Sequence, residues 1–266
     1  MDNILTDVKN IILIASGKGG VGKSTVASNL AVALARKGYS TGLMDADLYG
    51  PSIPLALGIN NQQPKIKKVG EKDIIVPLNN YGVKVMSLGF LIQKQDAIIW
   101  RGPLASKTLT QLIESTDWGK LDYLIVDMPP GTGDICITIA QKLPQSKAII
   151  VITPQQMAID DGRKAANMYR IEGVKITILG IVENMSYFIP EKHPDEKYLL
   201  FGKGGGEQLA TELNVPLLVQ IPLVSDVCDL GDSGKTIFAS SNEIIIEVFE
   251  NLVEKISERC SALSEK

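Results

Sequence analysis

The sequence predicts an α/β fold, a doubly wound and mostly parallel sheet with helices on both faces. Three observations predict it: short apolar runs alternate with amphipathic stretches, most runs are continuous, and a glycine-rich motif directly follows the first run. Continuous β-branched runs are typical of strands that are buried on both faces of a parallel sheet. Alternation of strands and helices implies right-handed crossovers, which place helices on both sides of the sheet.

Seven apolar runs are the expected strands, and the amphipathic stretches between them are the expected helices. We expect strands at residues 11–15, 41–44, 83–86, 123–126, 148–152, 176–182 and 217–221. Helices are expected at residues 23–37, 104–114, 135–142, 158–169 and 205–213, followed by an amphipathic C-terminal helix at 242–261. Within residues 65–88, one short extra strand at 74–76 and a turn at 79–82 lead back to the sheet. Residues 187–206, rich in Pro, Gly and charge, predict a long surface loop.

Length and composition favour a single domain over residues 1–266, with residues 1–10 as a short N-terminal lead. A chain of 266 residues with 45% hydrophobic residues can bury one large core. The formal net charge of −3 gives no general attraction to nucleic acid or to an anionic membrane. No apolar run approaches the ~18 residues that cross a bilayer, the N-terminus does not resemble a signal peptide, and the three cysteines are widely spaced. We therefore expect a cytoplasmic protein with no nucleic-acid partner and no integral membrane association.

The strongest motif is G-x-x-x-x-G-K-[ST], which lies between the first strand and the first helix. In that context, backbone N–H groups and the helix N-terminus surround phosphate oxygens, so the motif predicts an ATP site. Lys23 is expected to neutralise the β- and γ-phosphates, and Ser24 to ligate Mg²⁺. The expected nucleotide-binding residues in this loop are Gly17, Lys18, Gly19, Gly20, Val21, Gly22, Lys23, Ser24 and Thr25.

Further polar residues follow later strands, at the edge of the sheet where α/β proteins bind ligands. Asp127 ends a strand and is expected to hold Mg²⁺ through water, and the N–H of Gly131 is expected to reach the γ-phosphate. Asp45 or Asp47 orients the attacking water, or serves as a turn or helix-cap acid. Asn184 offers a donor and an acceptor that match the edge of adenine, although Asn is also common in turns.

The string Lys18-Gly19-Gly20-Val21-Gly22-Lys23-Ser24-Thr25 resembles the deviant Walker A loop of the ParA, MinD and nitrogenase iron protein group. The resemblance implies that Lys18 reaches the nucleotide of a partner subunit in a homodimer with nucleotide at the interface. It also favours Asp47 over Asp45, because the switch aspartate of that group occupies this place. The implied catalytic residues are Lys18, Lys23 and Asp47.

Other strings resemble one branch of that group, the Mrp-type iron–sulfur cluster carrier ATPases. Trp-Arg-Gly-Pro at 100–103 and Asp-Met-Pro-Pro-Gly-Thr-Gly-Asp at 127–134 distinguish this branch. The matching stretches are residues 16–29, 44–52, 100–103, 118–134, 153–155, 183–188 and 231–235. The resemblance implies slow ATP hydrolysis and delivery of [4Fe–4S] clusters to apo iron–sulfur proteins or to assembly factors. The alternatives are a surface-positioning ATPase of the division-site or partition type, and a member that has lost cluster binding.

One feature of the branch is missing from this sequence. Relatives usually carry a CxxC just after the string that ends here at Phe188, whereas residues 189–195 of this chain contain no cysteine. Thiolates are the usual ligands of iron–sulfur clusters, so no cluster ligand is identifiable. Cys136 and Cys228 are interpreted as buried residues that act as small hydrophobic side chains. His193 with Glu191 or Asp195 either binds some metal or lies in a surface loop.

Overall fold

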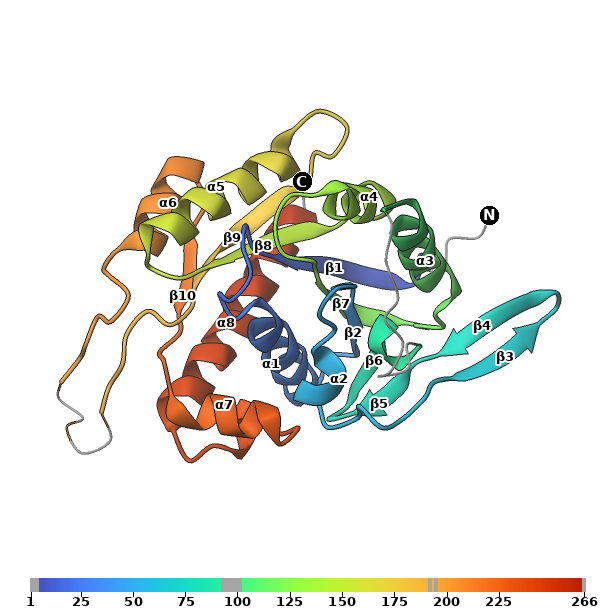
Figure 1. Cartoon of the computed structure of the whole chain (residues 1–266), viewed down its shortest axis with the longest axis horizontal. Helices are drawn as coiled ribbons and strands as arrows, with labels where there is room; N and C mark the ends of the chain where they lie inside the picture. The colour runs from blue at the N-terminus through green and yellow to red at the C-terminus, as the bar shows by residue number, and fades with distance from the viewer. Residues whose placement is uncertain (1–4, 92–101, 191–192, 194–195, 265–266) are drawn as a thin grey trace.

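A central sheet of eight strands organises the protein (Figure 1), seen in a computed structural model that describes residues 5–91, 102–190, 193 and 196–264. The strand order is β10-β9-β8-β1-β7-β2-β6-β5. Every neighbouring pair is parallel except β5 with β6, which is antiparallel. The strands are β1 (Val8–Ala15), β2 (Thr41–Asp45), β5 (Leu78–Asn80), β6 (Val83–Ser87), β7 (Leu121–Asp127), β8 (Lys147–Ile152), β9 (Thr177–Glu183) and β10 (Leu217–Gln220). The predicted fold class is therefore confirmed.

Helices cover both faces of this sheet (Figure 1). One layer contains α1 (Lys23–Arg36), α2 (Ile53–Ala56), α7 (Ser225–Asp232) and α8 (Glu243–Ser264). The other contains α3 (Gly102–Ser115), α4 (Asp134–Lys142), α5 (Gln156–Arg170) and α6 (Gly205–Leu213). The apolar core between the layers includes fully buried Trp118, Tyr169 and Phe249. No helix that the structure describes is both long and apolar enough to cross a membrane.

The passage from β1 to α1 shows why the sequence folds as it does around the glycine-rich loop. The last five residues of β1 are all buried, as a strand with neighbours on both edges and helices on both faces requires. Helix α1 begins after Gly22, which adopts a left-handed conformation with φ of 79°. The helix ends at Arg36, and Gly38 with φ of 91° turns the chain toward β2.

The region between β2 and β7 differs from the prediction of one extra strand at 74–76. A separate antiparallel hairpin forms there from β3 (Lys65–Val69) and β4 (Lys72–Val76), and β5 pairs with β6 beyond it. The sequence reasoning missed β3 because lysines interrupt its apolar pattern, and it missed β5 because that strand has three residues. It also missed α7, none of whose residues is buried. Two 3₁₀ turns, Leu88–Phe90 and Ile237–Ala239, were likewise not predicted.

The long surface loop was predicted well, since no helix or strand lies between β9 and α6 in the described residues. Isolated bridges join Phe188 to Tyr198 and to Leu223, and hold the root of this loop against the body. The strands on which candidate residues were predicted end at the same edge of the sheet. Asp45 at the end of β2 lies directly beside Asp127 at the end of β7. The topology therefore brings residues that are far apart in sequence to one place.

Candidate functional site

The glycine-rich loop, residues 17–24, lies between β1 and α1 and borders a cavity of about 220 Å³. Lys18, Lys23, Ser24, Asp47 and Pro130 line this cavity together with the glycines of the loop. The loop passes so close to α5 that a Cβ on Gly17 would lie 1.9 Å from the carbonyl oxygen of Asp161. Only glycine fits there, which explains the first glycine of the motif by packing as well as by phosphate binding.

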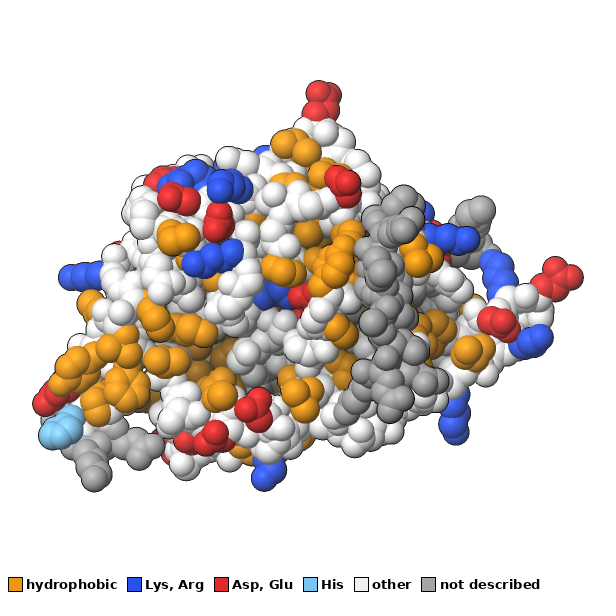
Figure 2. All heavy atoms as spheres, viewed as in Figure 1, with side chains coloured by type: hydrophobic (Ala, Val, Ile, Leu, Met, Phe, Trp, Pro, Cys, Tyr) orange, Lys and Arg blue, Asp and Glu red, His pale blue; other side chains and the backbone are white. Residues whose placement is uncertain are grey.

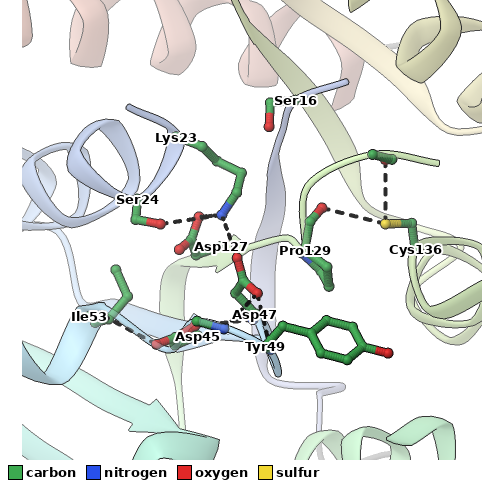
Figure 3. A network of polar contacts seen from close by, with 12 residues as sticks. Ser16, Lys23, Ser24, Asp45, Asp47, Tyr49, Ile53, Asp127, Pro129 and Cys136 are labelled. Carbon is green, nitrogen blue, oxygen red and sulfur yellow. Dashed lines mark hydrogen bonds and ion pairs between the residues drawn. The ribbon is translucent and has the colours of Figure 1, made fainter. Parts of the chain in front are cut away.

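Lys23 is the buried centre of the site, and its side chain is only 6% exposed (Figure 3). Its Nζ lies 2.6 Å from Asp127 Oδ1, 3.8 Å from Asp47 Oδ2 and 3.3 Å from Ser24 Oγ. A buried ammonium is stable only when carboxylates or other acceptors surround it. The structure thus brings the predicted residues Lys23, Ser24, Asp47 and Asp127 into one cluster.

Asp127 has one oxygen occupied and one without a partner. Oδ1 accepts from Lys23, whereas Oδ2 is buried and has no donor among the described residues. Burial raises the pKa of the Asp127 carboxyl, and the Lys23 ammonium opposes that rise. An unpaired buried carboxylate oxygen beside a hydroxyl is a donor set that Mg²⁺ prefers, directly or through water. These residues therefore fit the predicted Mg²⁺ site.

Asp45 and Asp47 play different structural parts at the end of β2. Asp45 is fully buried and accepts from the N–H groups of Asp47 and Ile53 and from the Ser87 hydroxyl. Burial, followed by repulsion from Asp127, raises the pKa of Asp45 to about 8. Asp47 Oδ1 accepts from the N–H groups of Tyr49 and Gly50, both at 3.3 Å, so Oδ2 is the atom turned toward Lys23. Asp45 therefore holds the turn, and Asp47 has an oxygen available to the cavity.

The loop after β7 is tied to the glycine-rich loop through main-chain contacts. The N–H of Gly131 donates to the carbonyl of Ser16 at 2.9 Å. This N–H was predicted to reach the γ-phosphate, and it can do so only after that hydrogen bond opens. Cys136 packs beneath the same loop, with its Sγ 3.5 Å from the carbonyl oxygen of Pro129 (Figure 3). Burial raises the pKa of the Cys136 thiol to about 11, so it is protonated at neutral pH.

Asn184 connects the glycine-rich loop to a second cavity. Its Nδ2 donates to the carbonyl of Val21 at 2.9 Å, and its own N–H donates to Ile152. The second cavity, of about 230 Å³, has a mostly apolar wall and lies on the other side of Gly22 and Thr25 from the first. Two adjoining cavities, one polar and one apolar, match the phosphates and the base of a nucleotide.

Residues that the sequence analysis missed form the wall of this second cavity. They come from the segment after β10, from α7, from the 3₁₀ turn that follows α7 and from α8: Ile221, Pro222, Leu223, Val224, Val227, Cys228, Ile237, Ile245 and Phe249. Glu183 was also missed, although it ends β9 as Asp127 ends β7. It is buried and accepts from Ser186, Gln220 and the N–H of Gly206, which fixes both ends of the 187–206 loop. Its position at a strand end was the available signal.

The remaining predicted residues lie apart from this cluster. Lys18 is half-exposed, and its ammonium has no partner among the described residues, although the residue lines the phosphate cavity. His193 is exposed, with Nδ1 3.6 Å from Glu196. Its proposed companions Glu191 and Asp195 lie outside the described residues, as do Trp100 and Arg101. Of the cysteines, Cys136 and Cys260 are buried and Cys228 is exposed. The interpretation of Cys228 as a buried residue was therefore wrong.

Comparison with known proteins adds to this geometry. Residues 7–257 match the ParA family, in the form described as NUBPL iron-transfer P-loop NTPase. The chain is 50% identical over 236 residues to the iron–sulfur cluster carrier protein of Synechocystis sp., covering 89% of this chain and 66% of that protein. It therefore spans slightly less than two thirds of that relative. The Pseudomonas fragi iron–sulfur cluster carrier protein is 47% identical over 93% of this chain and 85% of its own.

A solved structure resembles the whole arrangement. It is the nucleotide-binding protein of Archaeoglobus fulgidus in complex with ADP, with cobalt found in it. Its TM-score to this chain is 0.76 at 37% sequence identity, over 88% of this chain and 91% of that one. The shared fold and the nucleotide in that protein agree with the paired cavities described above.

Proposed function

The chain belongs to the ParA family, in its NUBPL-type branch of iron-transfer P-loop NTPases, and we propose that it binds and slowly hydrolyses ATP while carrying iron–sulfur clusters to other proteins. The proposal that this protein binds ATP rests above all on the buried Lys23, which pairs with Asp127 beside two adjoining cavities. The proposal that it carries iron–sulfur clusters is supported by relatives that are named iron–sulfur cluster carrier proteins. The ADP bound to the Archaeoglobus protein supports a nucleotide as the ligand of these cavities.

The proposed reaction is in-line attack of water on the γ-phosphate, with no covalent enzyme intermediate. Positioning and electrostatics supply the catalysis in such sites. Lys23 exchanges its carboxylate partners for phosphate oxygens when ATP enters, because both compete for the same ammonium. Asp47 Oδ2 then orients the attacking water, since Oδ1 is held by the backbone of its own turn. Gly17 to Thr25 bind the phosphates, and Asn184 borders the base.

Mg²⁺ fits the residues at the bottom of the phosphate cavity. Ser24 would hold it directly and Asp127 through water, because Asp127 Oδ2 lacks a donor among the described residues. When bound, the ion supplies charge neutralisation for the β- and γ-phosphates. Among the described residues that line the cavity, Lys18 is the only cationic residue besides Lys23. We propose that Lys18 completes the site of a partner subunit in a cytoplasmic homodimer.

The ligands of a carried iron–sulfur cluster have to be sought outside a CxxC motif, because this chain has none. Its three cysteines are dispersed, and only Cys228 is exposed. In the part of the chain that the structure describes, no group of three or more His, Cys, Asp and Glu could hold a metal ion. We propose that a cluster carried by this protein takes ligands from more than one subunit, and that the recipients are apo iron–sulfur proteins.

Light scattering tests the proposed ATP-dependent dimerisation, and phosphate release tests the proposed ATP hydrolysis. With ATP and Mg²⁺, the wild type should dimerise and release phosphate, whereas Lys18→Ala should bind ATP yet remain monomeric. Lys142→Ala is a matched control, because Lys142 forms only an exposed ion pair with Glu114. Equal mass and equal phosphate release for wild type and Lys18→Ala would show that no subunit completes another's site. Absence of phosphate release from the wild type would show that the chain is not an ATPase.

A further inference from the structure

The hairpin of β3 and β4 lies outside the central sheet and projects from the body of the protein (Figure 1). All five residues of β3 are exposed, and the exposed fractions of Ile66 and Val69 are 64% and 57%. A strand that buries so little apolar surface adds little to the stability of the core. Strand β3 is therefore poorly explained as a packing element, in contrast to β4, which buries Ile75.

The outer edge of β3 is open. Strand β4 occupies the inner edge, and β4 in turn is joined to the body by the bridge between Ile75 and Thr116. Among the described residues, no backbone or side-chain group other than β4 bonds to the main chain of β3. An edge of this kind presents unpaired N–H and C=O groups on which another strand can align.

The hairpin is also a local positive region on an acidic protein. Residues 65–73 contain four lysines against two acids, whereas the whole chain carries a net charge of −3. Figure 2 shows basic side chains on both sides of this arm. Lys67 pairs with Asp117, while Lys65, Lys68 and Lys72 form no ion pair in the described part of the chain. Three unpaired cations on one hairpin, two of them on β3, favour an acidic partner.

We propose that the open edge of β3 binds an extended acidic segment of another protein by strand addition. Five residues of β3 span about 17 Å, so a segment of that length pairs fully. Lys65 and Lys67 lie on one face of the strand and Lys68 on the other, because side chains alternate. The segment that fits carries acids opposite Lys65 and Lys68, since Lys67 already pairs with Asp117, and an apolar residue opposite Ile66. Lysines that only guarded the edge against pairing would not need the exposed Ile66 and Val69 beside them.

Fluorescence anisotropy with a labelled nine-residue peptide tests this proposal. The probe carries Glu at the positions that face Lys65 and Lys68 and Val or Thr at the other positions, and it should bind the full chain. The double variant Lys65→Glu, Lys68→Glu should weaken binding about tenfold, because two cross-strand attractions become repulsions. A charge-matched double variant, Lys175→Glu and Lys203→Glu, changes exposed lysines outside the hairpin and should bind as the wild type does.

Two peptides with N-methylated backbones separate strand addition from simple charge attraction. A strand that adds to one edge uses every second N–H, so methylation of one alternate set should abolish binding and methylation of the other should preserve it. This comparison uses the unchanged protein and decides the question even where a lysine variant does not fold. The proposal is overturned if the parent peptide does not bind, if both methylated peptides bind equally, or if single-stranded RNA of equal charge binds as tightly.

Discussion

Lys23 sets the electrostatics of the site at the scale of single residues. Its ammonium is the cation beside Asp127 and Asp47, and Asp45 is near enough to Asp127 that repulsion raises its own pKa. Removing this cation would leave the buried Asp127 carboxylate without its partner. The glycine-rich motif and the strand-end position of Asp127 were enough to predict that these residues meet. The role of Asp45 as the residue that holds the turn could not be predicted, because it depends on Ser87 from another strand.

Replacing Lys23 with Met should lower the free energy of unfolding by about 3 kcal/mol, because Asp127 loses its buried partner. It should also abolish ATP binding. Lys142→Met removes an exposed pair with Glu114 and should change stability by less than about 0.5 kcal/mol. Urea unfolding monitored by circular dichroism measures both variants. Equal unfolding free energies for the two variants would contradict the assigned role of the buried pair.

Asp45 predicts a pH dependence of stability, because burial raises its pKa to about 8 from an ordinary value of 3.8. Between these pH values the folded state holds a proton on Asp45 that the unfolded chain has released. Wild-type stability therefore loses this contribution as pH rises toward 8. In Asp45→Asn the contribution is missing, so the difference in unfolding free energy, variant minus wild type, should rise from pH 4 to pH 8 and then level off.

The lost hydrogen-bond acceptor in Asp45→Asn adds a constant offset and leaves this slope unchanged. Chemical unfolding at a series of pH values measures the difference directly. A difference that stays flat, or that falls with rising pH, would show that Asp45 is ionised in the folded protein across this range.

At the scale of elements, the glycine-rich loop leads into α1 and contacts Asn184, the residue that follows β9. Gly22 has a left-handed conformation, and a Cβ there would lie 2.1 Å from Asn184 Nδ2. Asn184 in turn holds the carbonyl of Val21. The loop that surrounds phosphate is thus shaped by the residue at the edge of the base cavity. We expect phosphate binding and base binding to depend on each other through this contact.

Gly22→Ala should therefore lower the unfolding free energy by about 2 kcal/mol, from backbone strain and the displaced Asn184. ATP affinity should fall with it, as measured with a fluorescent ATP analogue. Gly19→Ala is the matched control, because a Cβ at Gly19 meets nothing within 4 Å and its φ is not positive. Similar losses in both variants would show that the loop tolerates no side chain anywhere, and that the contact with Asn184 is not the cause.

Helices and strands could be predicted from the sequence where their buried residues form a regular apolar pattern. Buried strands such as β1 and β8 are continuous apolar runs, and the helices between them are amphipathic. Strand β3 and helix α7 were missed because they bury little, so no apolar pattern distinguishes them. Exposed elements of this kind are specified by turns and by single contacts, such as the left-handed Gly70 between β3 and β4.

At the scale of the whole molecule, the parallel sheet explains why one edge carries the chemistry. Strands β2 and β7 both end there, and the loop after β1 lies next to them. The C-terminal part, from β10 to α8, contributes the wall of the second cavity, although its sequence carries no phosphate-binding motif. The nucleotide site thus draws on both ends of the chain. A single domain over residues 1–266 remains a prediction.

Anaerobic reconstitution with iron and sulfide tests whether this protein binds an iron–sulfur cluster and passes it on. Iron and sulfide are counted per dimer after desalting, visible absorption is recorded, and the loaded protein is mixed with an apo iron–sulfur protein. We expect iron retained on the dimer, a visible cluster band, and transfer of that band to the acceptor. No retained iron, with ATP binding intact, would contradict the carrier function and leave a nucleotide-hydrolysing protein without this cargo.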